Sequence, residues 1–191
     1  MIYDITQELF SGDVYPGDKR PEFTRLRSFE KGDMSTLTEF SMNAHNATHI
    51  DAPIHKVRGG KAIDEIPLEV FVGECEVIPY SDKERLRNTK STRILLAGCE
   101  CIDEETAKLL VNKGVIFVAV EGQSVGTREV HVILLSKEVI VLEGVRLSHV
   151  PAGEYFLSAA PIKLGGCDGA PCRAILIDRL YWRTLSRKYG V

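Results

Sequence analysis

The apolar run Val115 to Val120 leaves no polar position on either side of an extended chain. A strand of this kind is buried on both faces, so other layers of the fold must cover it on both sides. A clear helix pattern precedes it, because Asp103 is placed as an N-cap, acidic residues fill the first turn and Gly114 follows. We therefore predict a helix over Asp103–Lys113 that leads into a fully buried strand.

Several further segments have the alternation or apolar runs that are typical of strands. The predicted strands are Ile2–Ile5, Leu37–Ala44, Gly73–Pro79, Arg93–Ala97, Val139–Leu142, Tyr155–Ala159 and Arg173–Ile177. Leu37–Ala44 alternates in polarity and is predicted to be half-buried, whereas Pro67–Phe71 predicts one helical turn and Tyr15–Asp18 a tight turn. A chain of 191 residues supports one hydrophobic core. We predict an α/β fold in a single strand-rich domain that spans residues 1–191, with a topology that the pattern leaves open.

The composition narrows the class of partner. The chain is 44% hydrophobic and 27% charged with a formal net charge of −3, which gives no reason to expect nucleic acid or an anionic membrane as partner. The N-terminal segment has no secretory pattern, and no apolar stretch reaches the length of a membrane span. We therefore expect a cytoplasmic protein that acts on a small molecule.

The cysteines are odd in number and lack C-x-x-C spacing. They are Cys75, Cys99, Cys101, Cys167 and Cys172. Together with the missing secretory pattern, this favours reduced thiols over a disulfide framework. A redox pair or an auxiliary metal ligand among them stays open.

Three of the five histidines fall between His45 and His55, and Asp51 lies among them. Imidazole and carboxylate groups together suit zinc, manganese or iron rather than calcium. His45 and His49 would share one face of a helix, whereas His49 and Asp51 would point the same way in an extended chain. Pro53 and the β-branched neighbours also fit a loop, and each geometry lets the three groups converge on one ion. His55 is either a further ligand or a general base.

This segment resembles the H-x-G-T-H-x-D-x-P-x-H motif of the cyclase family of metal-dependent hydrolases, which includes kynurenine formamidase and isatin hydrolase. Ala47 stands in place of the motif glycine. The likeness extends along nearly the whole chain. Further similar stretches are Tyr3–Ile5, Val14–Asp18, Gly60, Asp64, Pro67–Glu69, Gly73, Val141–Val145 and Gly166–Arg173.

The resemblance implies a metal-dependent hydrolase of a small amide, either a formamide or a cyclic amide, on a swivelling β/β/α fold. The implied metal ligands are His45, His49, Asp51, His131 and Glu143. The implied acid/base residue is His55. One or two divalent ions are expected, with zinc as first choice and manganese as second, in a homodimer or homotetramer. From the residues alone, His131 in its apolar surroundings and Glu143 after a strand would be weak candidates, and His149 matches no motif position.

Two departures from the family pattern leave the substrate open. The family's xDxPSxD stretch is Val120–Gly126 here, with Glu121 for the first aspartate and Gly126 for the second. The segment between Leu96 and Asp103 is short, where many formamidases carry aromatic residues. Aromatic residues make up only 7% of the chain. The remaining candidates for an aryl pocket are Phe23, Phe40 and Phe71.

Three other functions are alternatives to amide hydrolysis. Gly122–Gly126 matches the G-x-S-x-G string of serine hydrolases, but no equally good triad accompanies it. A lyase or dehydratase of the same family would use the same ligands on a hydroxy-carbonyl substrate. A catalytically silent metal-binding module is the third, and the presence of His55 argues against it, because a purely structural site does not need that residue.

Overall fold

The computed structural model describes residues 1–179 and 181. Its α-helices are α1 (Leu68–Phe71), α2 (Lys83–Asn88), α3 (Glu104–Asn112) and α4 (Arg128–Leu135). Its strands are β1 (Ile2–Asp4), β2 (Glu22–Arg27), β3 (Leu37–Ser41), β4 (His49–Asp51), β5 (Val72–Pro79), β6 (Arg93–Ala97), β7 (Phe117–Ala119), β8 (Ile140–Glu143), β9 (Gly153–Ser158), β10 (Gly169–Pro171) and β11 (Ile175–Asp178). Within these described ranges, no helix is long and apolar enough to cross a membrane.

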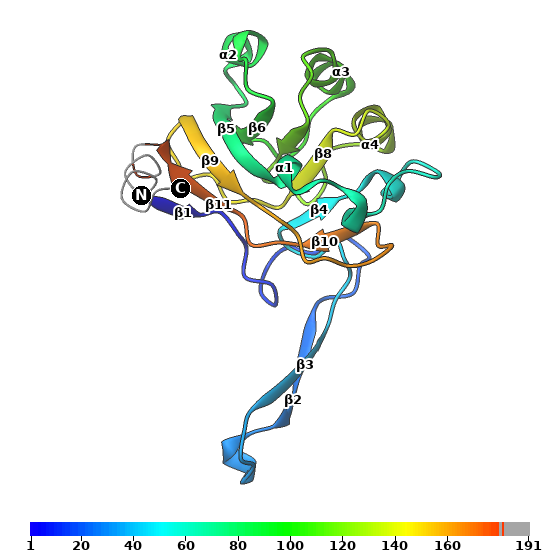
Figure 1. Ribbon diagram of the computed structural model, residues 1–191, viewed down its shortest axis with the longest axis vertical. Coiled ribbons are helices and arrows are strands. Elements are labelled where there is room, and N and C mark those ends of the chain that lie inside the picture. Colours follow the sequence, from blue (N-terminus) through cyan, green and yellow to red (C-terminus); the bar gives the residue numbers. More distant parts are fainter. Residues whose placement is uncertain (180, 182–191) are drawn as a thin grey trace.

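One large sheet has the strand order β1-β11-β9-β5-β6-β7-β8-β4-β10 (Figure 1). Strands β5 to β8 lie side by side in parallel, and the flanking strands pair antiparallel. The apolar run at Val115–Val120 forms β7, which is shorter than predicted and buried along its whole length. The strand-rich mixed α/β fold predicted from the sequence is confirmed.

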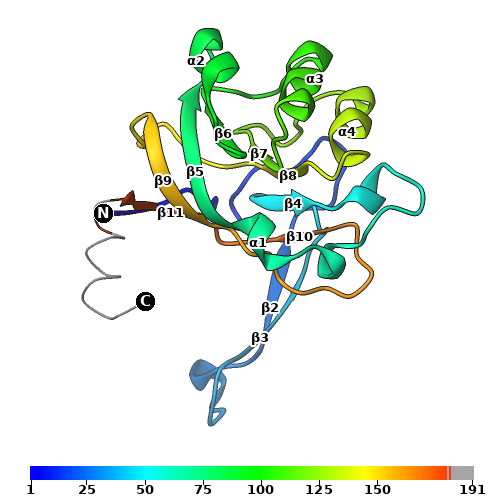
Figure 2. The same ribbon diagram turned by 45° about the horizontal axis from the view of Figure 1, so that its top comes forward.

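Apolar side chains from alternate positions of the central strands form two clusters, one on each face of the sheet. Ile94 and Leu96 face α2, α3 and α4, which cover one side of the sheet in Figure 2. Leu95, between them, belongs to the second cluster. That cluster also contains Ile50 from β4 and Leu176 from β11, which come from the two flanks of the sheet. The sheet therefore curls around the second cluster, and this curl sets the position of β4.

The helix that the sequence indicated most clearly is α3. Asp103 is its N-cap and accepts a hydrogen bond from the backbone N–H of Thr106 at 2.7 Å. Gly114 follows the helix with φ +71°, as the predicted C-terminal glycine should. Pattern reading missed α2 and α4. The β-branched residues of α4, among them Val130, Val132 and Ile133, are weak helix formers, and the helix forms because one face packs on the sheet.

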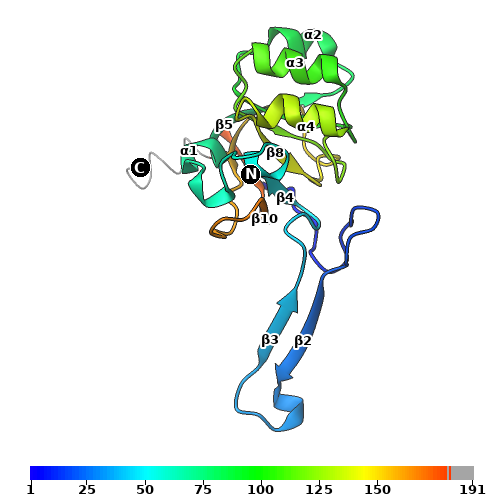
Figure 3. The ribbon, with the colours of Figure 1, turned by 90° about the vertical axis from the view of Figure 1, so that its right-hand side faces the viewer.

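The prediction of a half-buried strand over Leu37–Ala44 is wrong in its burial. Strand β3 forms, but it pairs only with β2, and every residue of both strands is exposed. The two strands and the turn between them project from the rest of the molecule (Figure 3), and we call this segment the hairpin arm. Phe23 and Phe40, paired across the arm, are 50% and 53% exposed. The alternation reflects two different faces of a ribbon. On one face the ring of Phe10 lies 4.9 Å from that of Phe23 and 6.5 Å from that of Phe40, which still leaves both residues exposed.

Candidate metal centre

Strand β4 carries two of the motif side chains and lies between β8 and β10. His49 and Asp51 are two residues apart on extended backbone, so they point to the same side, as the extended alternative predicted. The helical alternative for His45 and His49 is wrong, because β4 begins at His49. In the antiparallel register, His49 lies opposite Glu143 on β8, which brings their side chains together.

Backbone carbonyl groups fix the rings of His49 and His131. The Nδ1 atom of His49 lies 3.0 Å from the Ala47 carbonyl oxygen, and Nδ1 of His131 lies 2.9 Å from the Thr127 carbonyl oxygen one turn earlier in α4. An imidazole that donates from Nδ1 keeps a lone pair on Nε2, the arrangement that metal-binding histidines use. Both Nε2 atoms therefore face the same buried space.

That space holds the carboxylates of Asp51 and Glu143, whose residues are only 1% and 2% exposed. The Nε2 atoms of His49 and His131 each lie 3.2 Å from an oxygen of Glu143 and 3.5 Å from an oxygen of Asp51. His45 approaches from the preceding turn, with Nδ1 2.8 Å from Asp51 Oδ1. The structure thus brings together all five residues predicted as ligands.

The buried carboxylates dominate the electrostatics of the cluster. Burial by itself lowers the pKa of His49 and of His131, but hydrogen bonds and charge from Asp51 and Glu143 outweigh it and raise each pKa to about 10. Burial likewise opposes ionisation of Asp51, yet contacts with the surrounding histidines hold the pKa of that carboxyl well below its ordinary value. The site therefore strongly favours positive charge between its carboxylates.

The donor set fits a divalent metal ion. Among the described residues, three groups have ligand atoms close enough to share an ion: His45, His49 and Asp51; Asp51, His55 and His131; and His45, His55 and Asp168. His49 Nε2 and Asp51 Oδ2 are buried without an aligned hydrogen bond, although opposite charges lie within 4 Å. Neutral imidazole nitrogens and carboxylate oxygens with this orientation are typical ligands for zinc or manganese.

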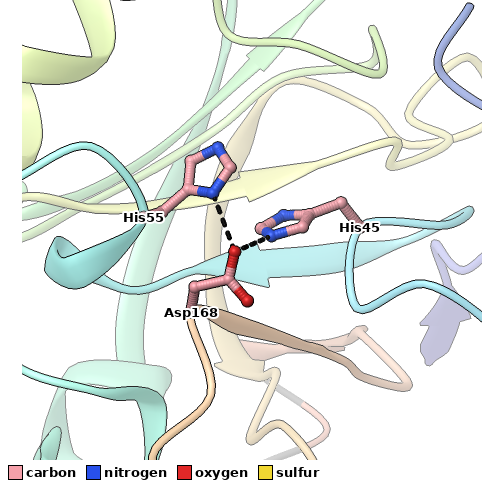
Figure 4. A group of neighbouring side chains, drawn as sticks. All are labelled: His45, His55 and Asp168. Carbon is pink, nitrogen blue, oxygen red and sulfur yellow. Dashed lines mark hydrogen bonds and ion pairs between the residues drawn. The ribbon is translucent and has the colours of Figure 1, made fainter. Parts of the chain in front are cut away.

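Sequence reasoning missed Asp168, which joins His45 and His55 (Figure 4). Its Oδ2 atom lies 2.9 Å from His45 Nε2 and 3.1 Å from His55 Nδ1. Burial raises the pKa of Asp168, but these two contacts outweigh it and lower that pKa. Burial lowers the pKa of His55, and the positive charge of His45 lowers it further. The similarity of Gly166–Arg173 to the family loop was the available signal for Asp168.

A cavity of about 780 Å³ opens over this cluster. Its walls include Tyr15 from the YPGD turn and Met42 from the base of the hairpin arm. None of the three phenylalanines proposed for an aryl pocket lines it. Phe71 is buried in the core, and Phe23 and Phe40 belong to the arm.

The Val120–Gly126 segment supports the site through its backbone and one carboxylate. The backbone N–H of Val125 donates to Glu143 Oε1 at 2.6 Å. Glu121 accepts hydrogen bonds from the N–H groups of Gly98 and Leu147, so it ties two loops together. The Ser124 hydroxyl donates to the Gly126 carbonyl and has no histidine partner within the described chain, which disfavours the serine hydrolase interpretation.

The thiols are separate from this chemistry. All five cysteines are free, as predicted. Cys75, Cys99 and Cys172 are buried, and burial raises the pKa of each thiol to about 12. No cysteine belongs to the candidate metal-binding groups found among the described residues.

A family model described as "Putative cyclase" matches residues 3–100, which include the whole His45–His55 motif. The chain belongs to the cyclase family. A kynurenine formamidase of Salinibacter ruber is 32% identical over 193 residues, covering 86% of this chain and 91% of that protein. A kynurenine formamidase of Bacillus anthracis is 29% identical over 200 residues, covering 91% and 95% of the two chains.

Solved structures of the cyclase family share the fold. One, described as a potential metal-dependent hydrolase with cyclase activity, is 30% identical, covers 94% of this chain and 98% of its own, and has a TM-score of 0.80. Isatin hydrolase A of Labrenzia aggregata is 21% identical, covers 92% and 93%, and has a TM-score of 0.72, which supports the fold alone. The resemblance to the cyclase family and its fold are thereby confirmed.

Replacing Gly144 by alanine is expected to damage the support beneath the cluster. Gly144 follows Glu143 with φ +70°, and an added Cβ would lie 2.5 Å from the Ala47 carbonyl oxygen. We expect Gly144→Ala to lower the free energy of unfolding by about 2–4 kcal/mol, measured by urea denaturation. The matched control is Gly114→Ala, which has φ +71° and open space around its Cβ, and should cost only about 1–2 kcal/mol. Equal losses would contradict the packing argument.

Proposed function

We propose that this chain is a metal-dependent hydrolase that cleaves a small amide, either a formamide or a cyclic amide. The observation that carries the proposal is the orientation of His49 and His131, whose Nε2 atoms converge on the buried carboxylates of Asp51 and Glu143. The kynurenine formamidase relatives and the solved neighbour described as a potential metal-dependent hydrolase support the same activity. Amide hydrolysis would use three features of the site together. These are the metal-binding donor set, the neighbouring histidines His45 and His55, and the open cavity.

In this proposal the metal is zinc, with manganese as the alternative. The ligands are His45, His49, Asp51, His131 and Glu143. Asp51, like His45 and His55, belongs to two of the three close groups. Its carboxylate has two oxygens, so it can contact two ions if two are bound. A bound divalent ion lowers the pKa of a coordinated water and polarises a carbonyl oxygen, which is the chemistry that amide hydrolysis needs at neutral pH.

His55 supplies the proton transfers in this proposal. Its Nδ1 atom contacts Asp168, so a proton on Nδ1 leaves the Nε2 lone pair free to accept another. The lowered pKa of His55, caused first by burial, favours this neutral form. The proton taken up at Nε2 is then available to the leaving nitrogen of the amide. Asp168 holds the ring in the required orientation.

The ligand assignment predicts the metal content of single variants. After loading with zinc or manganese and desalting, His49→Ala and Glu143→Ala should bind the metal at least about 100-fold more weakly than the wild type. Elemental analysis and metal titration measure this without an activity assay. His149→Ala removes an exposed histidine outside the cluster and should keep the wild-type metal content. Full metal content in His49→Ala would show that the ligand set is wrong.

The acid/base assignment predicts a different behaviour for His55→Ala. This variant should keep its metal while kcat/KM for N-formylkynurenine or formanilide falls by about 10²–10⁴-fold, because the proton acceptor is lost. Loss of metal instead would make His55 a ligand. A rate equal to that of the wild type would exclude both roles.

We also propose a homodimer or homotetramer, with the hairpin arm as a contact between copies. A two-stranded ribbon alone is only marginally stable in water. The arm nevertheless exposes large apolar side chains on both strands and at its tip. These are Phe23, Leu26, Phe29, Met34, Leu37 and Phe40. A second copy of the chain is the occupant that the family resemblance implies, and a symmetric assembly would cover both arms at once.

Sedimentation experiments test this assembly. The wild type should sediment as a dimer or tetramer, and the double variant Phe23→Ser/Phe40→Ser should shift to a smaller species, because it removes the apolar pair that faces across the arm. Leu68→Ser is the control, since Leu68 is equally apolar, 66% exposed and far from the arm in sequence. A monomeric wild type at micromolar concentration would contradict the proposed assembly.

A further inference from the structure

Two positively charged side chains line the cavity over the metal centre. Lys56 directly follows His55 at the end of the turn Pro53–His55, and Arg128 is the first residue of α4. Lys56 is adjacent to His55, and Arg128 lies three residues before His131 on α4, so each cation shares a segment with a histidine that lines the cavity. An anion that occupied the cavity would therefore meet positive charge beside the acid/base residue.

Neither cation is held by an ion pair within the described chain. Within the described part of the chain, the side chains of Lys56 and Arg128 make no ion pair and no hydrogen bond. Other basic residues differ in this respect: Lys61 pairs with Glu138 at 2.7 Å, and Arg146 pairs with Asp13 at 2.5 Å. A cation on a cavity wall that lacks an internal partner is available to bind a ligand.

Three carboxylates at or beneath the cavity are engaged by histidines rather than by Lys56 or Arg128. Asp51, Glu143 and Asp168 contact the histidines of the cluster. Asp18 is the remaining acidic residue of the lining, and it is exposed at the YPGD turn. Tyr15 is the only phenol or phenyl ring among the lining residues, so stacking offers little orientation for a substrate. Charge is the stronger available means of selection.

We propose that Lys56 and Arg128 bind a carboxylate group on the substrate, so that this enzyme acts on anionic amides. The inference rests on the proposed amide hydrolase activity and names its substrate class. The guanidinium of Arg128 can bind a carboxylate through two parallel hydrogen bonds, and the ammonium of Lys56 adds a point charge. A substrate whose carboxylate is held there would have its amide group in the same cavity as His55.

A matched pair of substrates tests the inference. Formanilide is neutral, and formanilides with an ortho, meta or para carboxylate differ from it only in that charge. With the metal-loaded wild type, at least one carboxylated compound should have a kcat/KM about tenfold or more above formanilide, and this ratio should fall with rising ionic strength. A wild type that prefers neutral formanilide over all three would overturn the inference and leave the hydrolase activity in place.

Charge-removing variants locate the binding groups. In Lys56→Met and in Arg128→Met, the ratio of kcat/KM for the preferred carboxylated compound to that for formanilide should fall about tenfold. Arg58→Met is the matched control, because Arg58 is exposed, lies two residues from Lys56 and does not line the cavity. It should keep the wild-type ratio. An equal fall in all three variants would indicate a general field effect and contradict a defined carboxylate site.

A binding measurement separates this inference from the proposed activity. Isothermal titration with benzoate and with benzamide, on the metal-loaded protein, needs no turnover. Benzoate should bind the wild type more tightly than benzamide, and the double variant Lys56→Met/Arg128→Met should lose at least about tenfold in benzoate affinity. If no formanilide is hydrolysed but this difference holds, the carboxylate site stands and the activity fails. If benzoate binds the wild type and the double variant equally, the carboxylate site is refuted.

Discussion

The structure depends on the pairing of two buried carboxylates with two oriented imidazoles. Asp51 and Glu143 are almost fully buried, and a buried carboxylate is costly unless opposite charge and hydrogen bonds surround it. That requirement fixes three elements at once, because His49 is on β4, Glu143 on β8 and His131 on α4. The curl of the sheet and the packing of α4 on it are what bring these elements within 4 Å of one another. A metal ion between the same groups would satisfy the same electrostatic demand.

The backbone beneath the cluster is correspondingly tight. The Gly144 carbonyl accepts hydrogen bonds from Gln7 Nε2 at 2.8 Å and from the Thr48 hydroxyl at 2.7 Å, which ties the N-terminal segment and the motif threonine to β8. Ala47 has φ +54° at the position where the family motif has glycine. This left-handed conformation costs free energy for alanine, but it aims the Ala47 carbonyl at His49 Nδ1. The motif glycine is thus explained by the orientation of a ligand.

The sequence predicts the parts of this structure whose causes are local. The bounds of β6 match the prediction at Arg93–Ala97, and α3 has the cap that Asp103 predicted, since apolar runs and caps act within a few residues. Exposure of the hairpin arm could not be predicted, because alternation separates two faces of a strand without saying what covers them. Asp168 joins a histidine 123 residues away, and only the pairing of β10 with β4 brings it there. His131 needed the family resemblance for the same reason.

The two departures within Val120–Gly126 lie beside the candidate metal centre rather than among its proposed ligands. Glu121 stands where the family pattern has aspartate, and its side chain accepts hydrogen bonds from two backbone N–H groups, which anchors the loop. Gly126 stands where the pattern has the second aspartate, and the backbone N–H of the preceding Val125 donates to Glu143. Neither position belongs to the five proposed ligands. Such replacements change the charge and shape of the loops around the site, and these loops select the substrate. The same metal chemistry can therefore act on a different amide.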